Sequence, residues 1–124
     1  MLNKRKILIY LSAPYSAKNK ESIEANIRFA EQNMIELLKK GYSVICPHKN
    51  TSHLDDIMPW AAFMEMSFTH IQKCEAVFFC GGWQLSRGCW EEYQYCLKNN
   101  IPSFTEMESL EEYVVNSEKF KGGK

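Results

Sequence analysis

Two adjacent carboxylates, Glu91 and Glu92, end the segment GGWQLSRGCWEE at residues 81–92. The spacing of apolar residues after this segment predicts a helix from about Gly88 to Lys98. The stripe that this helix would bury consists of Cys89, Tyr93, Cys96 and Leu97. Because residues three and four apart share a helix face, Glu92 lies at the edge of this stripe and Glu91 on the wetter side. A half-buried carboxylate in a first helical turn can act as a nucleophile or a general base. Alternatively, both glutamates only complement the helix dipole.

The loop before this helix has residues suited to binding a small ligand. Gly81 and Gly82 allow the chain to leave a strand with backbone angles that other residues avoid. Ser86 stands at the right interval to cap the helix, and free N–H groups near Gly88 favour an anion or a sugar hydroxyl. Trp83 can stack on a base or pack in the core. A capped turn without any ligand explains the same residues, so both interpretations stay open.

Two earlier loops contain further polar candidates. The first, residues 12–16, follows Tyr10, whose hydroxyl can reach the same cleft or lie at the rim of the core. The second, residues 48–56, offers partners for hydroxyl groups of a ligand, although such residues also form turns. The candidate ligand-binding residues of these loops are Ser12, Pro14, His48 and Asn50. His48 and His53 have no companion at the spacing of metal ligands, so no metal site is expected.

Short apolar runs alternate with amphipathic segments along the chain. We expect strands at residues 7–11, 43–46, 76–80 and 102–104, and helices at residues 20–40, 59–72, 88–98 and 109–117. Ser109 and Glu112 have capping-box spacing and are expected to open the last helix. This alternation predicts an α/β fold with a four- to five-stranded, mostly parallel sheet and helices on both faces. Ligands of such sheets lie at the carboxyl ends of the strands, where all three loops fall. His70 has the spacing of a core or interface residue.

The composition restricts the classes of function. The chain has 124 residues, which favours one domain over residues 1–124, with its core at about 7–104 and a frayed tail. Fifteen basic residues balance fifteen acidic ones, so a nucleic-acid polymer is not an expected partner. No apolar run approaches the ~20 residues that span a bilayer. Five cysteines without a CxxC pair predict a reduced, cytoplasmic protein. Neither a dinucleotide-binding nor a P-loop motif occurs, and no cofactor is expected.

Three segments carry a resemblance to a known family: IYLSAPYS, GYSVICPH and CEAVFFCGGWQLSRGCWEEYQYCLKNNIP. They resemble the nucleoside 2-deoxyribosyltransferase-like superfamily, in particular its small phage and bacterial members of unassigned function. The most specific element is the spacing Ser86-x-Gly88-x-x-x-Glu92. The resemblance implies a flavodoxin-like (Rossmann-like) three-layer sandwich that binds a nucleoside or nucleotide. It also implies that Glu92 attacks the anomeric carbon of the sugar, that Tyr10 positions Glu92, and that Ser86 and Gly88 line the sugar or phosphate pocket.

One position departs from the family pattern. Ser67 stands where relatives usually have an aspartate that assists the leaving base or binds the sugar. A serine cannot act as a general acid at neutral pH. Glu65 and His70 are the nearby candidates to replace the missing acid, but helical geometry turns Glu65 away from position 67.

Three functions therefore stay open. The first is an enzyme that cleaves or transfers an N-glycosidic bond through Glu92. The second is a protein that binds a nucleotide without efficient turnover, for example a phage protein that sequesters or degrades a nucleotide signal in the host cytoplasm. The third is a purely structural or interaction domain. Because relatives often build the pocket between subunits, we also expect a dimer or larger homo-oligomer.

Overall fold

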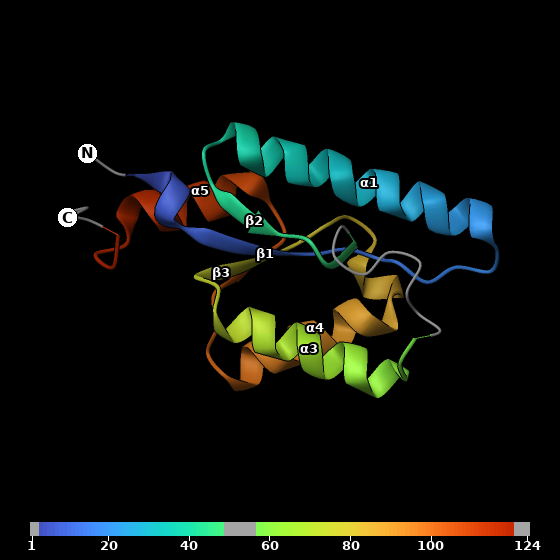
Figure 1. Ribbon diagram of the computed structural model, residues 1–124. Coiled ribbons are helices and arrows are strands. Elements are labelled where there is room, and N and C mark those ends of the chain that lie inside the picture. Colours follow the sequence, from blue (N-terminus) through green and yellow to red (C-terminus); the bar gives the residue numbers. More distant parts are fainter. Residues whose placement is uncertain (1–2, 49–56, 121–124) are drawn as a thin grey trace.

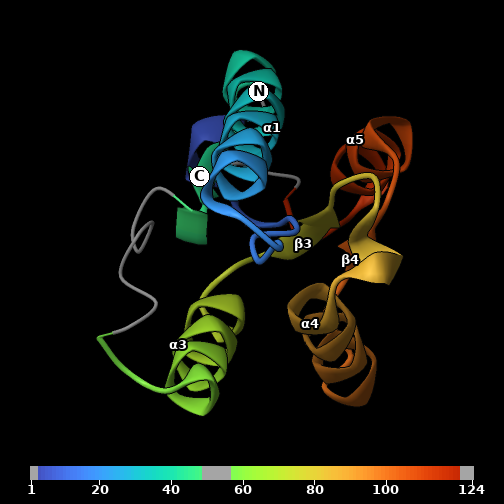
Figure 2. The ribbon, with the colours of Figure 1, turned by 90° about the vertical axis from the view of Figure 1, so that its right-hand side faces the viewer.

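The computed structural model describes residues 3–48 and 57–120. Its sheet has four strands in the order β2-β1-β3-β4, and every neighbouring pair is parallel. The strands are β1 (Leu8–Ser12), β2 (Ser43–Ile45), β3 (Ala76–Phe79) and β4 (Ser103–Phe104). The helices are α1 (Lys20–Lys39), α3 (Trp60–Gln72), α4 (Arg87–Lys98) and α5 (Met107–Asn116), with short 3₁₀ turns η1 (Lys4–Lys6) and η2 (Trp83–Leu85). Helices α1 and α5 cover one face of the sheet, and α3 and α4 cover the other (Figures 1 and 2). The expected flavodoxin-like α/β sandwich is thus confirmed.

The two central strands, β1 and β3, are apolar almost throughout because both of their faces are covered. Successive side chains of a strand point to opposite faces. Ile9 and Leu11 therefore pack in the core shared with α1 and α5. Tyr10 points the other way, into the core shared with α3 and α4. This alternation directs Tyr10 to the layer in which α4 lies.

Two details of the helices differ from expectation. Helix α5 begins at Met107, after Glu106 at the N-cap, so the predicted capping box at Ser109 is wrong. The earlier start is set by packing, because Met107 contacts the core beneath α5. In α4, the buried face consists of Cys89, Glu92 and Cys96, and Leu97 is 59% exposed. Leu97 is turned away because it lies one residue, about 100° of helix rotation, past Cys96.

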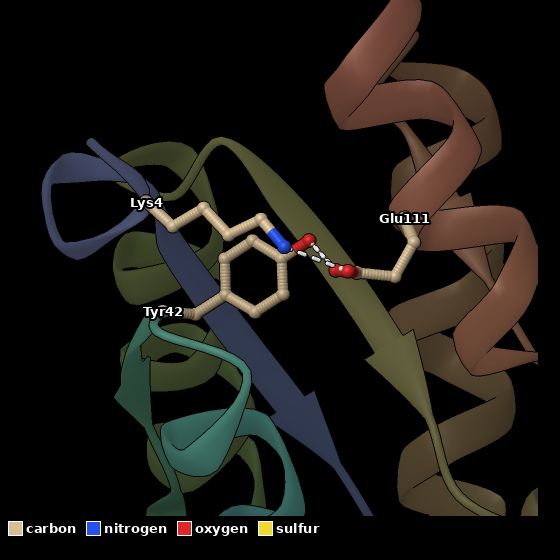
Figure 3. Close-up of polar contacts among 3 residues, drawn as sticks. All are labelled: Lys4, Tyr42 and Glu111. Carbon is tan, nitrogen blue, oxygen red and sulfur yellow. Dashed lines mark hydrogen bonds and ion pairs between the residues drawn. The ribbon is translucent and has the colours of Figure 1, made fainter. Parts of the chain in front are cut away.

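A polar cluster fixes α5 at the amino-terminal edge of the sheet (Figure 3). Lys4 Nζ lies 2.7 Å from Oε1 of Glu111, and the hydroxyl of Tyr42 donates to the other carboxylate oxygen. Burial alone would raise the pKa of Glu111, but the hydrogen bonds from Lys4 and Tyr42 hold it below its usual value. The cluster joins three segments that are far apart in the sequence. It lies before the start of β1 and β2 and therefore away from their carboxyl ends.

Candidate functional site

A cavity of about 300 Å³ opens on the α3 and α4 side of the sheet, at the carboxyl end of β1. Its walls come from the end of β1 and the loop after it, residues 47 and 48, one face of α3, and the start of α4. Six of the candidate residues line it: Tyr10, Ser12, His48, Ser86, Gly88 and Glu92. The folded chain thus brings together residues of all three loops that the sequence indicates. Asn50, a further candidate, lies outside the described residues.

Glu92 is positioned by the start of α4. The side chain of Ser86 accepts a hydrogen bond from the backbone N–H of Cys89 and caps the helix as expected. One turn later, Glu92 points inward and is only 7% exposed, more deeply buried than the sequence suggests. Glu91 is only partly buried, and its Oε2 lies 3.6 Å from Nε of Arg87. The phase of the helix therefore places Glu92 on the buried face of α4 and Glu91 outside it, as predicted.

Hydroxyl groups hold both carboxylate oxygens of Glu92. The hydroxyl of Tyr10 donates to Oε2 over 2.7 Å, and Ser12 Oγ donates to Oε1 over 2.6 Å. The hydroxyl of Ser67 is also within hydrogen-bonding reach of Glu92 and Tyr10. Hydrogen bonds from hydroxyls to a carboxylate are short and strong. Ser12, a candidate for ligand binding, thus acts here on the carboxylate itself.

The surroundings of Glu92 shift its acidity. Burial raises the pKa of Glu92, and the hydrogen bonds from Ser12, Tyr10 and Ser67 only partly oppose this rise. Burial also raises the pKa of Tyr10 well above its usual value, and the negative charge of Glu92 adds to the effect. Tyr10 therefore keeps its proton and serves as a donor. A desolvated carboxylate in a fixed orientation is suited to attack an electrophilic carbon or to accept a proton.

One hydrogen bond fixes the ring of His48. Its Nε2 lies 2.8 Å from the carbonyl oxygen of Pro14, and its ring packs edge-on against Tyr15. Because a carbonyl only accepts, Nε2 carries the proton. Burial lowers the pKa of His48, although the bond to Pro14 opposes the shift. Pro14 itself does not line the cavity and contributes through this carbonyl.

Trp83 does not reach the cavity. It is 8% exposed and packs against Phe79, Tyr93 and Trp90 in the core beneath α4. This placement fits the packing role predicted for Trp83 and does not fit base stacking. Its position follows from Gly82, whose φ of 83° turns the chain into η2 and directs the indole inward. Gly81 needs no such angle.

Helix α3 contributes more of the cavity wall than the sequence indicates. Its lining residues are Trp60, Phe63, Met64, Met66, Ser67 and His70. The face of α3 that carries Phe63, Met66 and His70 borders the cavity, so of the two predicted positions of His70 the closed core is wrong. At the mouth, the guanidinium of Arg87 lies 4.2 Å from the ring centre of Trp60. A stripe that borders a cavity has the same periodicity as one that borders a core, which is why the sequence could not distinguish them.

In residues 3–48 and 57–120, no three His, Cys, Asp or Glu side chains are grouped so that they could hold a metal ion. No helix in the same part of the chain is long and apolar enough to cross a membrane.

The fold and the cavity define a flavodoxin-like α/β protein with a buried glutamate at the carboxyl edge of its sheet. Its carboxylate accepts hydrogen bonds from Tyr10 and Ser12 on β1, and the hydroxyl of Ser67 on α3 lies nearby. The chain belongs to the family described as a domain of unknown function, DUF7768, whose family model matches residues 7–105. The match includes every residue of the cavity. No curated protein matches the chain.

Proposed function

We propose that the protein cleaves the N-glycosidic bond of a nucleoside or nucleotide, and that Glu92 is the nucleophile. The observation that carries the proposal is the setting of Glu92: a buried carboxylate, oriented through both oxygens, on the wall of a ligand-sized cavity. A volume of about 300 Å³ lies at the small end of the range for small-molecule sites. The resemblance to the nucleoside 2-deoxyribosyltransferase-like superfamily gives the proposal its substrate class.

The reaction follows the covalent mechanism of retaining glycoside chemistry. One carboxylate oxygen of Glu92 attacks the anomeric carbon while the bond to the base breaks and its electron pair passes to the base nitrogen. The product is a glycosyl ester of Glu92 and a free base. Water or a second base then attacks the same carbon and releases the carboxylate, which gives hydrolysis or transfer. Tyr10 and Ser12 keep the attacking group oriented in both halves of the reaction.

The walls of the cavity suit the two parts of such a substrate. Trp60, Phe63 and Met66 provide an apolar surface on α3 that a base can contact. Ser16 and Ser86 provide hydroxyl groups on the opposite loops, where a sugar can form hydrogen bonds.

Glu92→Gln tests the assignment, because it removes the nucleophile and keeps the size of the side chain. We expect it to abolish the release of base from the nucleosides and nucleotides that the parent protein cleaves. Glu91→Gln is the matched control and should retain the parent rate, because Glu91 does not line the cavity. With a slowly deglycosylated 2-fluoro sugar substrate, mass spectrometry should find the sugar on the peptide that contains Glu92. Base release by Glu92→Gln at the parent rate would refute the proposal.

A second candidate function is nucleotide binding without turnover, for instance to sequester a signalling nucleotide. The position of Ser67 favours it, because a hydroxyl instead of a carboxylic acid lies beside Glu92 and Tyr10. Incubation with candidate nucleotides, denaturation and chromatography distinguish the two functions. Intact nucleotide released from the protein means binding, and free base or a sugar product means catalysis.

A further inference from the structure

Cleavage of an N-glycosidic bond needs an acid as well as a nucleophile. When the bond breaks, the base nitrogen takes the electron pair, and without a proton the base leaves as an anion. A side chain that supplies this proton accelerates such a step by about 10²–10⁴-fold. Glu92 cannot supply it, because its carboxylate forms the bond to the sugar. The acid must therefore be another group on the cavity wall.

Most of the groups on the described part of the wall are unsuitable. Ser67 and the other hydroxyls hold their protons at neutral pH, and the guanidinium of Arg87 does not release one. Burial, together with the charge of Glu92, raises the pKa of Tyr10 well above its usual value. Burial likewise raises the pKa of the Cys89 thiol to about 11, with a further contribution from Glu92. No carboxyl group other than that of Glu92 lines the described wall. Imidazole remains the only type of side chain there that ordinarily exchanges a proton near neutral pH.

The described wall contains two imidazoles, and their settings differ. The proton on Nε2 of His48 is already donated to the carbonyl oxygen of Pro14. Burial also lowers the pKa of His48, which disfavours a second proton on its ring. His70 is half-buried on α3, three residues after Ser67 on the same face of the helix. This separation corresponds to a rise of about 4.5 Å along the helix.

The geometry points to His70 as the catalytic acid that protonates the departing base, an inference that rests on the proposed function. Ser67 reaches the carboxylate that attacks the sugar, and Phe63, Ser67 and His70 follow one another along a single face of α3. A base attached to that sugar and lying along this face has its outer nitrogens beside the imidazole. His70 donates the proton to the base as the C–N bond breaks. In the second half-reaction, neutral His70 accepts a proton from the attacking water, which restores the starting state.

Substrates with different leaving groups test this role. Purine nucleosides and their N7-methyl forms make a matched pair, because the methylated base has a fixed positive charge and leaves as a neutral molecule. His70→Gln should cleave guanosine or inosine, in the ribose or deoxyribose form that the parent protein accepts, about 10²–10⁴-fold more slowly. Cleavage of the N7-methyl form should be almost unchanged. Glu92→Gln should be inactive on both substrates, because the nucleophile is needed in each case.

Two further variants separate catalysis from folding. In His70→Ala, added imidazole should restore cleavage of the unmethylated substrate without changing the melting temperature. Glu65→Gln alters an exposed acid on the same helix, outside the cavity, and should behave as the parent protein.

Each other outcome has a clear meaning. If His70→Gln slows both substrates equally, or slows neither, the proton-donor role is wrong while the role of Glu92 stands. If the parent protein cleaves neither series, the role of His70 as the acid for a purine base is wrong. If it also releases no base from pyrimidine nucleosides or from nucleotides, the proposed function itself fails.

Discussion

Tyr10→Phe removes a single hydroxyl group from the centre of the site and leaves the ring in place. In the parent protein this hydroxyl donates to Oε2 of Glu92 over 2.7 Å, and both residues are buried. A hydrogen bond to a charged group contributes about 1.5–3 kcal/mol to stability. Since Ser12 and Ser67 remain as donors to Glu92, we expect a loss near the lower end, about 1.5–2 kcal/mol. For a chain of this size, such a loss lowers the melting temperature by roughly 5–8 °C.

The assay is thermal and denaturant unfolding of four proteins: the parent, Tyr10→Phe, Glu92→Gln and the double variant. If the lost energy comes from the bond to the carboxylate, Tyr10→Phe should cost less in the Glu92→Gln background, where the partner is uncharged, about 0.5–1.5 kcal/mol. Tyr113→Phe is the control, because Tyr113 packs on the far side of the sheet. Loss of a donor to the charged form should also raise the pKa of Glu92 further, so the acid limb of any pH–rate profile should move to higher pH. Equal losses in both backgrounds, or no loss in either, would refute the reasoning.

Three further predictions concern stability. Burial raises the pKa of Glu92, so ionisation of this carboxyl group opposes folding at any pH above its pKa in the unfolded chain. The stability of Glu92→Gln relative to the parent should therefore increase as the pH rises. Denaturant unfolding at acidic and at neutral pH measures this increase. Trp83→Ala should lower the free energy of unfolding by about 3–5 kcal/mol, because the indole is buried. Trp90→Ala should lower it much less, because Trp90 is 45% exposed. A stable Trp83→Ala protein with weakened ligand binding would contradict the packing role. Glu111→Gln should lower the free energy of unfolding by about 1 kcal/mol at neutral pH, because the ion pair with Lys4 is partly exposed. At a pH below the lowered pKa of Glu111, the substitution should cost nothing. The same loss at both pH values would show that charge is not the cause.

The sequence predicts the fold well because its strongest signals are local. The apolar runs of β1 and β3 are buried on both faces, so they carry an uninterrupted signal over their whole length. The separation of Glu91 from Glu92 is also local, because it depends only on the phase of a single helix. The predicted start of α5 is wrong for the opposite reason, because the contact of Met107 with the core depends on how the helix packs.

The contacts within the site that the sequence could not predict depend on the packing of one element against another. Ser67 reaches Glu92 only because α3 and α4 lie side by side on the same face of the sheet. No spacing within either helix contains that information. Ser12 is similar, since its hydroxyl meets the carboxylate across the interface between β1 and α4. The role of Trp83 depended on the direction in which η2 turns, and this is set by the positive φ of Gly82.

The buried face of α4 gives an independent reason to assign a function to Glu92. Cys89 and Cys96, its neighbours on that face, are the small, apolar side chains that packing alone would select. A carboxylate at the same depth loses hydration, and the raised pKa of Glu92 shows that its hydroxyl partners do not fully compensate for this loss. No lysine or arginine pairs with it among the described contacts, so an ion pair does not explain its presence. A desolvated carboxylate on the wall of a cavity is more readily explained by chemistry than by packing. Glu92→Gln therefore tests the functional role of Glu92 in two ways, because it should make the protein both more stable and inactive. A variant that is less stable and as active as the parent would contradict both expectations.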